Sequence, residues 1–350
     1  MNFRLQTQLV TIFIFLLVVC GEEEIDAAPP KPVADLEEEK DPGPKEEVIE
    51  KDSLPVVRSN ASFEVIIERD VVYAKGLSHN GPVHTREVLL KLDVYTPDND
   101  REKRPVFVFF HGGAFFGGEK EQQQIIHLAN YYASRGWVFI SADYRLRGDN
   151  GTIPQEWSNY PATELHVGRG QFLAMYPAVR DAKAALRWMV SNAATYHIDP
   201  DYITIGGGSV GAMMAIAAAV SKPEDFRDEI GLDEDSTLNT THMNHTFQAK
   251  TIINLWGSKV ILDALEGIYG YQRFNEDIPP MLTIHGIADL TVPFSETEAV
   301  KAIYEQYEVP LAHYPIRWGG HGVWNAIVNG KHIEELSYDF IVEQQGLKVE

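Results

Sequence analysis

The protein has 350 residues, a formal net charge of −21, and a composition that is 44% hydrophobic and 11% aromatic. This is enough apolar material for one sizeable core, as in an α/β domain. So acidic a chain repels phosphate backbones and anionic lipid headgroups, so we expect neither nucleic-acid binding nor stable membrane insertion. Composition leaves the oligomeric state open.

Residues 1–21 have the pattern of a signal peptide. Arg4 precedes an apolar run at 9–20, which is too short to cross a bilayer comfortably. Secretion is therefore predicted, with a lipid anchor or an uncleaved anchor as the alternatives. Cys20 is the only cysteine, so the mature protein would contain no internal disulfide. Four N-x-S/T sequons favour a secreted glycoprotein: Asn60, Asn150, Asn239 and Asn244.

The segment 22–58 is acidic and contains prolines. Residues 22–52 carry 13 acidic and 4 basic side chains. Such a segment cannot bury enough apolar surface to fold, so it is predicted to be a disordered linker or propeptide. The remainder, 59–350, is predicted to be a single catalytic domain.

Within that domain, apolar runs alternate with amphipathic ones. The first expected strand consists of the runs 63–68 and 70–74, and the others are 88–95, 105–110, 137–142, 202–206, 250–256, 280–285 and 311–316. The expected helices are 121–134, 178–194, 212–219, 295–308 and a last one ending near 343, with a Ser295–Glu298 capping box starting the fourth. This alternation predicts an α/β fold with a doubly wound, mostly parallel eight-stranded sheet flanked by helices.

One glycine-rich turn stands out between a predicted strand and helix. Residues 207–211 read Gly-Gly-Ser-Val-Gly and fit the G-x-S-x-G nucleophile elbow, with Ser209 at its apex. The alternative is a plain turn or a phosphate-binding loop, but the lysine that a P-loop requires is absent. The turn therefore predicts a nucleophilic serine.

A serine hydroxyl needs a base within hydrogen-bonding reach and a third group that orients that base. Residues after parallel strands gather at one sheet edge, where ligands bind. His321, which follows the last predicted strand, is expected to be the base, and Asp289 the orienting acid. Asp263 and Glu266 are the alternative acids.

Attack of a serine on a carbonyl carbon gives a tetrahedral intermediate with a negatively charged oxygen. Preorganised hydrogen-bond donors must stabilise this oxyanion, and each donor stabilises the transition state by about 3–4 kcal/mol. The backbone N–H groups of Gly112 and Gly113 are expected to supply them, with that of Val210 as the third. His111 is expected to order this loop rather than react. This chemistry requires neither cofactor nor metal, and His242 and His245 lack a third ligand, so they are interpreted as solvated loop histidines.

Several of these motifs resemble the α/β-hydrolase fold superfamily. They are the His-Gly-Gly-Ala run at 111–114, the serine elbow, His-Gly-Ile-Ala-Asp at 285–289 and Gly-His-Gly at 320–322. The chain is similar to the carboxylesterase/lipase branch with an H-G-G-G-type oxyanion loop, including hormone-sensitive-lipase-like and feruloyl-esterase-like enzymes. The segments 142–145, 181–188 and 198–200 match that branch too, and the resemblance covers roughly residues 60–345. It implies a serine carboxylic-ester hydrolase that forms an acyl-enzyme from a small-molecule ester.

The chain also departs from that family. The family usually has an acidic or bulky residue before the serine and Ala-Gly after it, but this chain has Gly208 and Val210 on either side of the serine. In the glycine loop, Ala114 replaces a third glycine. The segment between the strands at 250–256 and 280–285 is short, so we expect no large lid. Five aromatic residues could line a substrate pocket or belong to the core: Phe115, Phe116, Trp157, Tyr160 and Tyr176.

Two other functions fit the same fold. A non-catalytic, cholinesterase-like adhesion module typically lacks the serine, which this chain keeps. A serine exopeptidase usually carries an added propeller or other domain, and no repeat of that kind appears in this sequence.

Overall fold

The structure, a computed structural model, describes residues 54–79 and 85–350. The predicted signal peptide and most of the predicted linker lie outside the described residues. The last part of that linker is folded, however. Strand β1 (Val56–Val57) pairs in parallel with β12 (Lys348–Val349), and Val57 is fully buried. The folded unit therefore begins before residue 59.

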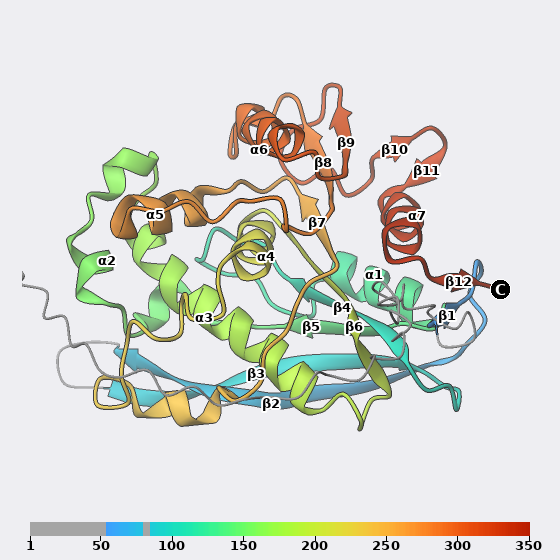
Figure 1. The fold of residues 1–350 in the computed structure, drawn as a ribbon, viewed down its shortest axis with the longest axis horizontal. Coiled ribbons are helices and arrows are strands. Elements are labelled where there is room, and N and C mark those ends of the chain that lie inside the picture. The colour runs from blue at the N-terminus through green and yellow to red at the C-terminus, as the bar shows by residue number, and fades with distance from the viewer. Residues whose placement is uncertain (1–53, 80–84) are drawn as a thin grey trace, which may run out of the picture. The chain divides into compact units, whose positions relative to one another are not determined.

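The main sheet has eight strands in the order β2-β3-β5-β4-β6-β7-β8-β9. Their bounds are β2 Val65–His79, β3 Thr85–Pro97, β4 Arg104–Phe110, β5 Val138–Ala142, β6 Ile198–Gly208, β7 Thr251–Leu255, β8 Met281–Gly286 and β9 Leu311–Ile316. Strands β2, β3 and β5 pair antiparallel, and the other neighbours pair in parallel. The predicted mostly parallel eight-stranded sheet is confirmed (Figure 1).

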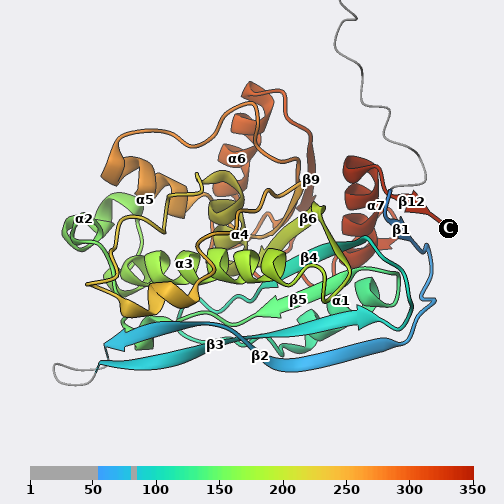
Figure 2. The same ribbon diagram turned by 60° about the horizontal axis from the view of Figure 1, so that its bottom comes forward.

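Helices cover both faces of this sheet. On one face, α1 (Gln123–Ala133) and α7 (Ile333–Gln345) contribute to one buried cluster. On the other, α3 (Arg169–Ser191), α4 (Val210–Val220), α5 (Val260–Tyr269) and α6 (Phe294–Gln306) contribute to a larger one (Figure 2). Strands β4, β5, β7 and β8 are buried at every residue, because helices cover them on both sides.

The remaining elements are short. They are α2 (Gln155–Asn159), the 3₁₀ turns η1 (Arg147–Asp149), η2 (Ala162–Leu165) and η3 (Ser236–Thr240), and the hairpin of β10 (Ile327–Val328) and β11 (Lys331–His332). Of the helices in the described ranges, none combines the length and apolarity that a bilayer crossing requires.

Three helix predictions need correction. Helix α3 begins at Arg169 rather than 178 and contains Pro177, whose ring packs closely against Gly151. Burial of this segment outweighs the hydrogen bond that the proline removes. Helix α6 has Pro293 at its N-cap and no side-chain cap, so the predicted Ser295–Glu298 capping box is wrong. Helix α5 was not predicted, because its sequence lies within a stretch interpreted as a short connection.

A buried ion pair ties the large helix α3 to the sheet. Arg145, just after β5, donates from Nε (2.8 Å) and Nη2 (2.6 Å) to the carboxylate of Asp181 in α3. Its Nη1 donates to the Leu77 carbonyl of β2 at 2.9 Å. Both side chains are almost fully buried, so each charge depends on the other for compensation. The pair fixes α3 against the strands that precede the elbow.

Candidate active site

Ser209 lies at a sharp turn between β6 and α4. Its backbone has φ 55° and ψ −124°, a conformation that costs a non-glycine residue of order 1–3 kcal/mol. Two glycines allow this turn. A Cβ on Gly207 would lie 2.2 Å from the Gly211 carbonyl carbon, and one on Gly211 would lie 2.1 Å from the Phe110 oxygen. The Ser209 amide donates to the Leu255 carbonyl at 2.8 Å, which fixes the turn to β7.

The structure brings Ser209, His321 and Asp289 together. His321 Nε2 lies 2.9 Å from Ser209 Oγ, and His321 Nδ1 lies 2.7 Å from Asp289 Oδ2. Ser209 follows β6, Asp289 follows β8 and His321 follows β9, so the carboxyl ends of parallel strands at one edge of the sheet bring the three residues together. The alternative acids Asp263 and Glu266 are in α5, and neither has a hydrogen bond to His321.

Asp289 accepts hydrogen bonds on both carboxylate oxygens. Oδ1 accepts from the amides of Thr291 (2.8 Å) and Val292 (3.0 Å), while Oδ2 accepts from His321 and His285. Burial by itself would raise the pKa of Asp289, but the hydrogen bonds from His321 and the two amides outweigh it. Its pKa therefore lies below its usual value, and the carboxylate is ionised at neutral pH.

The role of His285 was not anticipated from the sequence. It is fully buried at the end of β8, and its Nε2–H donates to Asp289 Oδ2 (3.0 Å) and to the Val292 carbonyl (3.0 Å). Its Nδ1 accepts from the Thr297 hydroxyl. Burial is the largest cause that lowers the pKa of His285, so the ring is neutral. Its spacing four residues before Asp289 was the available signal.

The glycine loop after β4 approaches the serine. A Cβ on Gly112 would lie 2.9 Å from the Gly208 oxygen and 3.3 Å from Ser209 Cβ. Gly113 has φ 127°, which favours glycine. Within the described residues, no acceptor is bonded to the amides of Gly112, Gly113 or Val210. These amides therefore remain available to a ligand beside Ser209.

His111 is built into that loop. Its Nδ1–H donates to the Gly112 carbonyl at 2.8 Å, and its ring stacks on Tyr144 with 4.3 Å between the centroids. The Tyr144 hydroxyl donates to the His111 carbonyl at 2.8 Å. Burial lowers the pKa of His111 to about 4, so the ring is a neutral strut at physiological pH.

Ser209 borders two cavities. One, of about 300 Å³, is lined by Trp256 and Trp324 on the side of His321. The other, of about 680 Å³, has mainly apolar walls that include Phe115, Leu165, Met175, Val210, Met213 and Val292. Three carboxylates also reach it: Glu164, Asp263 and Glu296.

The five aromatic residues singled out in the sequence have different positions. Phe115 lines the larger cavity, whereas Phe116 is 59% exposed. Trp157 and Tyr176 are fully buried core residues that pack on each other with 5.5 Å between the ring centroids, and Tyr160 packs at the edge of the same cluster. Most of these residues therefore serve the core.

Of the two histidines interpreted as solvated loop residues, His242 is less solvated than the sequence indicated. His242 is half-buried, with Nδ1 3.2 Å from Ser191 Oγ and Nε2 3.2 Å from the Tyr73 carbonyl. His245 is also only partly exposed. In the described ranges, no group of three or more His, Cys, Asp or Glu side chains is arranged to hold a metal ion.

The sheet order, the strand-end residues and the strained serine turn define an α/β-hydrolase. The BD-FAE family model matches residues 92–158 and 169–268, from β3 through α5. The family model, the relatives and the solved structures support the carboxylesterase/lipase branch of the α/β-hydrolase fold superfamily.

Relatives and solved structures carry esterase names. Esterase LipC of Mycobacterium tuberculosis is 22% identical over 73% of this chain and 64% of its own length. Isoprenylcysteine alpha-carbonyl methylesterase ICME of Arabidopsis thaliana is 23% identical over 70% and 60%. The structure of Thermogutta terrifontis esterase 2 phosphorylated by paraoxon aligns with a TM-score of 0.54 and 25% identity, over 77% of this chain and 94% of that one. The chain thus spans less than two thirds of the length of these two curated relatives.

Replacing His111 by Gln is expected to reduce the loss of unfolding free energy that occurs as the pH falls below 6.5. The folded pKa of His111 is about 4 and its unfolded value is 6.5, so the unfolded chain binds a proton first as the pH falls. Stability is therefore complete above the unfolded pKa and is lost as the pH falls from 6.5 towards 4, by about 3 kcal/mol for this one group.

Urea unfolding of both proteins at several pH values between 7.5 and 4.5 measures this difference. His127→Gln, which removes a 64% exposed ring from α1, is the matched control. Parallel stability profiles for wild type and His111→Gln would contradict the assignment of a buried neutral ring.

Proposed function

We propose that this protein is a secreted serine carboxylic-ester hydrolase that works through an acyl-enzyme. Ser209 is the nucleophile, His321 the general base and acid, and Asp289 the residue that orients and stabilises the imidazolium. The observation that carries the proposal is the pair of hydrogen bonds, 2.9 and 2.7 Å long, that joins the strained serine to the histidine and then to the aspartate.

In the proposed reaction, Ser209 Oγ attacks the ester carbonyl carbon while His321 Nε2 takes the hydroxyl proton. The carbonyl oxygen becomes an oxyanion that accepts from the amides of Gly112, Gly113 and Val210. Val210 begins α4, so the positive end of that helix dipole adds to the stabilisation. The alcohol leaves with the proton from His321. A water then attacks the acyl-enzyme by the same route and releases the acid.

His285 acts in this proposal as a positioning residue. It shares Asp289 Oδ2 with His321, so the carboxylate oxygen cannot rotate away from the base without losing both bonds. Because His285 is neutral and buried, it adds a donor without adding a competing charge.

The two cavities support a small-molecule ester as substrate. They border Ser209 on different sides, so the acyl and alcohol parts of an ester can each occupy one. The larger cavity, with its apolar walls, suits the larger and more apolar part of the molecule.

Ser209→Ala is expected to lower kcat/KM for 4-nitrophenyl butyrate by at least about 10⁴-fold, since the residual activity comes only from binding and oxyanion donors. Ser258→Ala removes another buried hydroxyl from the same cavity and serves as the matched control. Equal rates in wild type and Ser209→Ala would refute the proposal.

A fluorophosphonate probe should label Ser209 covalently. Failure of the probe to label this serine would favour the non-catalytic adhesion module.

His285→Asn is expected to lower kcat about tenfold with little change in KM, because it removes one hydrogen bond to a charged carboxylate. His313→Gln is the control. His313 packs on Phe294 at 5.8 Å between centroids, as His285 does, but it pairs with Glu298 rather than Asp289. If both variants lose stability equally and keep full kcat, His285 has no positioning role.

Secretion is proposed from the apolar segment in residues 1–21 and from the four sequons. All four sequon asparagines are exposed in the structure, as a glycan requires. Expression of the full chain in a eukaryotic secretory cell should release the protein into the culture medium. Its mass should then fall when the glycans are removed. Retention of the chain inside the cell without glycans would contradict secretion.

A further inference from the structure

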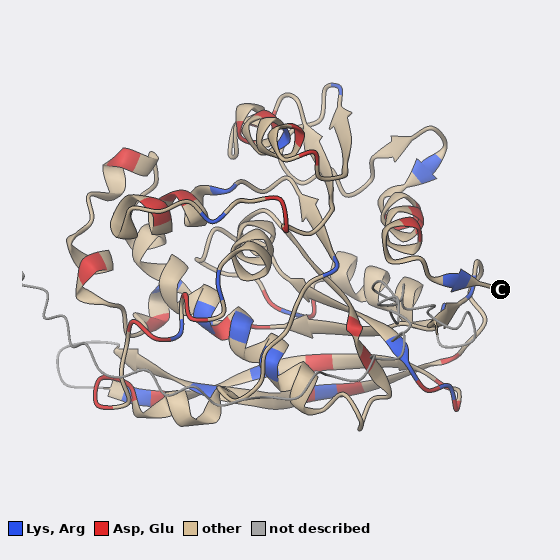
Figure 3. Ribbon diagram, in the orientation of Figure 1, with Lys and Arg blue, Asp and Glu red and all other residues tan. Residues whose placement is uncertain are grey.

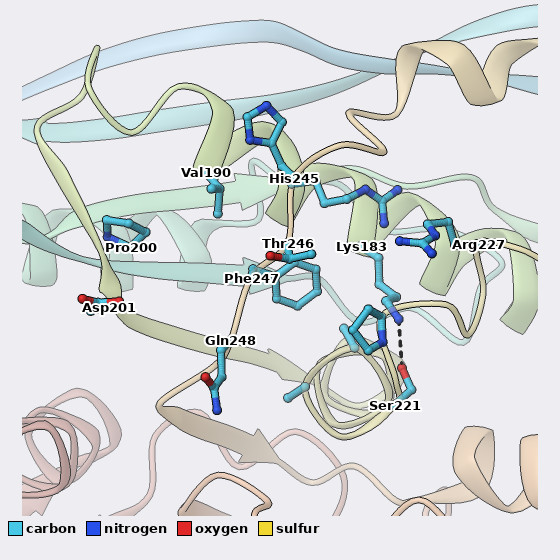
Figure 4. Close-up of a pocket in the computed structure, with 14 residues that line it drawn as sticks. Lys183, Val190, Pro200, Asp201, Ser221, Arg227, His245, Thr246, Phe247 and Gln248 are labelled. Carbon is cyan, nitrogen blue, oxygen red and sulfur yellow. Dashed lines mark hydrogen bonds between the residues drawn. The ribbon is translucent and has the colours of Figure 1, made fainter. Parts of the chain in front are cut away.

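A third cavity lies away from Ser209. It has a volume of about 610 Å³ and is bordered by the C-terminal half of α3, the C-terminal end of α4, the start of β6 and residues 245–248 (Figure 4). Ser209 is at the opposite end of α4, about 15 Å away along an 11-residue helix. The two sites share no lining residue.

Buried cations from α3 form one wall of this cavity. Lys183 and Arg187 are one helical turn apart and are only 1% and 2% exposed. Figure 3 shows the basic segments that follow one another along α3, in a chain whose net charge is −21. Buried charges are normally paired, so their partners decide what the cavity can hold.

Neither cation has a carboxylate partner within the described part of the chain. Lys183 Nζ donates to three neutral oxygens: Ser221 Oγ at 3.2 Å, Lys222 O at 2.6 Å and Asp225 O at 2.8 Å. Arg187 Nε donates to the Thr241 carbonyl at 2.8 Å. Its Nη2 is buried and has no hydrogen-bond partner among the described residues.

The nearest carboxylates are committed elsewhere. Both oxygens of Asp225 are bound by Arg273, each at 2.7 Å. Glu229 accepts from the Tyr176 hydroxyl and the Phe226 amide. Lys183 and Arg187 therefore have no carboxylate in direct contact, although the charges of Asp225 and Asp228 act on them from a distance.

A third cation and several neutral polar groups surround the same space. Arg227 lines the cavity and is paired with Asp228. In Figure 4, Lys183 and Arg227 lie together, while the exposed Asp201 lies away from both. Thr246 and Gln248 also border the cavity.

The low pKa values of the two buried cations agree with a missing anion. Burial lowers the pKa of Lys183 to about 7, even though attraction from Asp225 opposes this shift, and repulsion from Arg187 adds to it. Burial also lowers the pKa of Arg187 to about 10, together with repulsion from Arg227 and Arg180. A bound anion would reverse both shifts.

We propose that this cavity binds an oxyanion-bearing small molecule, of the phosphate or sulfate class, through Arg187 and Lys183. The guanidinium donates hydrogen bonds to the oxyanion, since a planar fork matches phosphate geometry. The ammonium contributes its charge, because its three protons are already donated within the protein. The volume exceeds that of a free ion, so the oxyanion can be free or part of a larger molecule.

Calorimetric titration of the full chain with inorganic phosphate, against chloride at equal ionic strength, tests this site. Wild type should bind phosphate at one site and unfold at a higher temperature in phosphate than in chloride. Titration with phenyl phosphate distinguishes a free ion from a phosphate ester, because the cavity has room for the ester. If the wild-type protein does not bind phosphate, that result alone overturns the proposal.

Arg187→Gln should weaken phosphate binding at least about tenfold, by the loss of a charge-assisted hydrogen bond. Arg187→Lys, which keeps the charge but not the planar fork, should retain part of the affinity. Lys301→Gln on α6, which removes a surface cation paired with Glu305, is the control and should bind phosphate as wild type does. Undiminished binding in a folded Arg187→Gln protein would refute the assignment of this cavity.

Discussion

The close approach of α4 to the ends of β4 and β6 is the constraint on which the site depends. Helix α4 meets the strand ends so closely that only glycine fits at positions 207 and 211. That contact holds Ser209 in a backbone conformation that an isolated peptide would avoid. The cost is of order a few kcal/mol, and it is offset by a helix whose residues are almost all buried between the sheet and α3. The core therefore supplies the free energy that keeps the serine in place.

Around that serine, charge is organised by hydrogen bonds rather than by ion pairs. Asp289 is the buried anion that contacts His321, and it remains ionised because four donors surround it. The two other histidines, His111 and His285, are buried and neutral, so each contributes donors and shape without charge. Any positive charge that develops during the proposed reaction would thus reside on His321 alone.

The two ends of helix α4 border chemically different cavities. Its N-terminal end carries the serine, where the helix dipole favours developing negative charge. Its C-terminal end borders the cavity with Lys183 and Arg187, whose charges come from α3 rather than from α4. The buried Arg145–Asp181 pair anchors that same α3 to the sheet. One helix pair thus connects the proposed esterase site to the proposed oxyanion site.

The sequence alone determined the fold class and the three residues joined by hydrogen bonds at the strand ends. Strand–helix alternation and the glycines around Ser209 are local patterns, and parallel strands place their carboxyl ends at one edge. It did not determine the extent of α3 or the start of α6, because burial overrode Pro177 and no side chain capped α6. The bonds of His285, the core positions of Trp157 and Tyr176, and the unpaired cations at 183 and 187 were decided only by tertiary structure. Each of these features depends on side-chain contacts between elements that are distant in sequence, and a local sequence pattern does not encode such contacts.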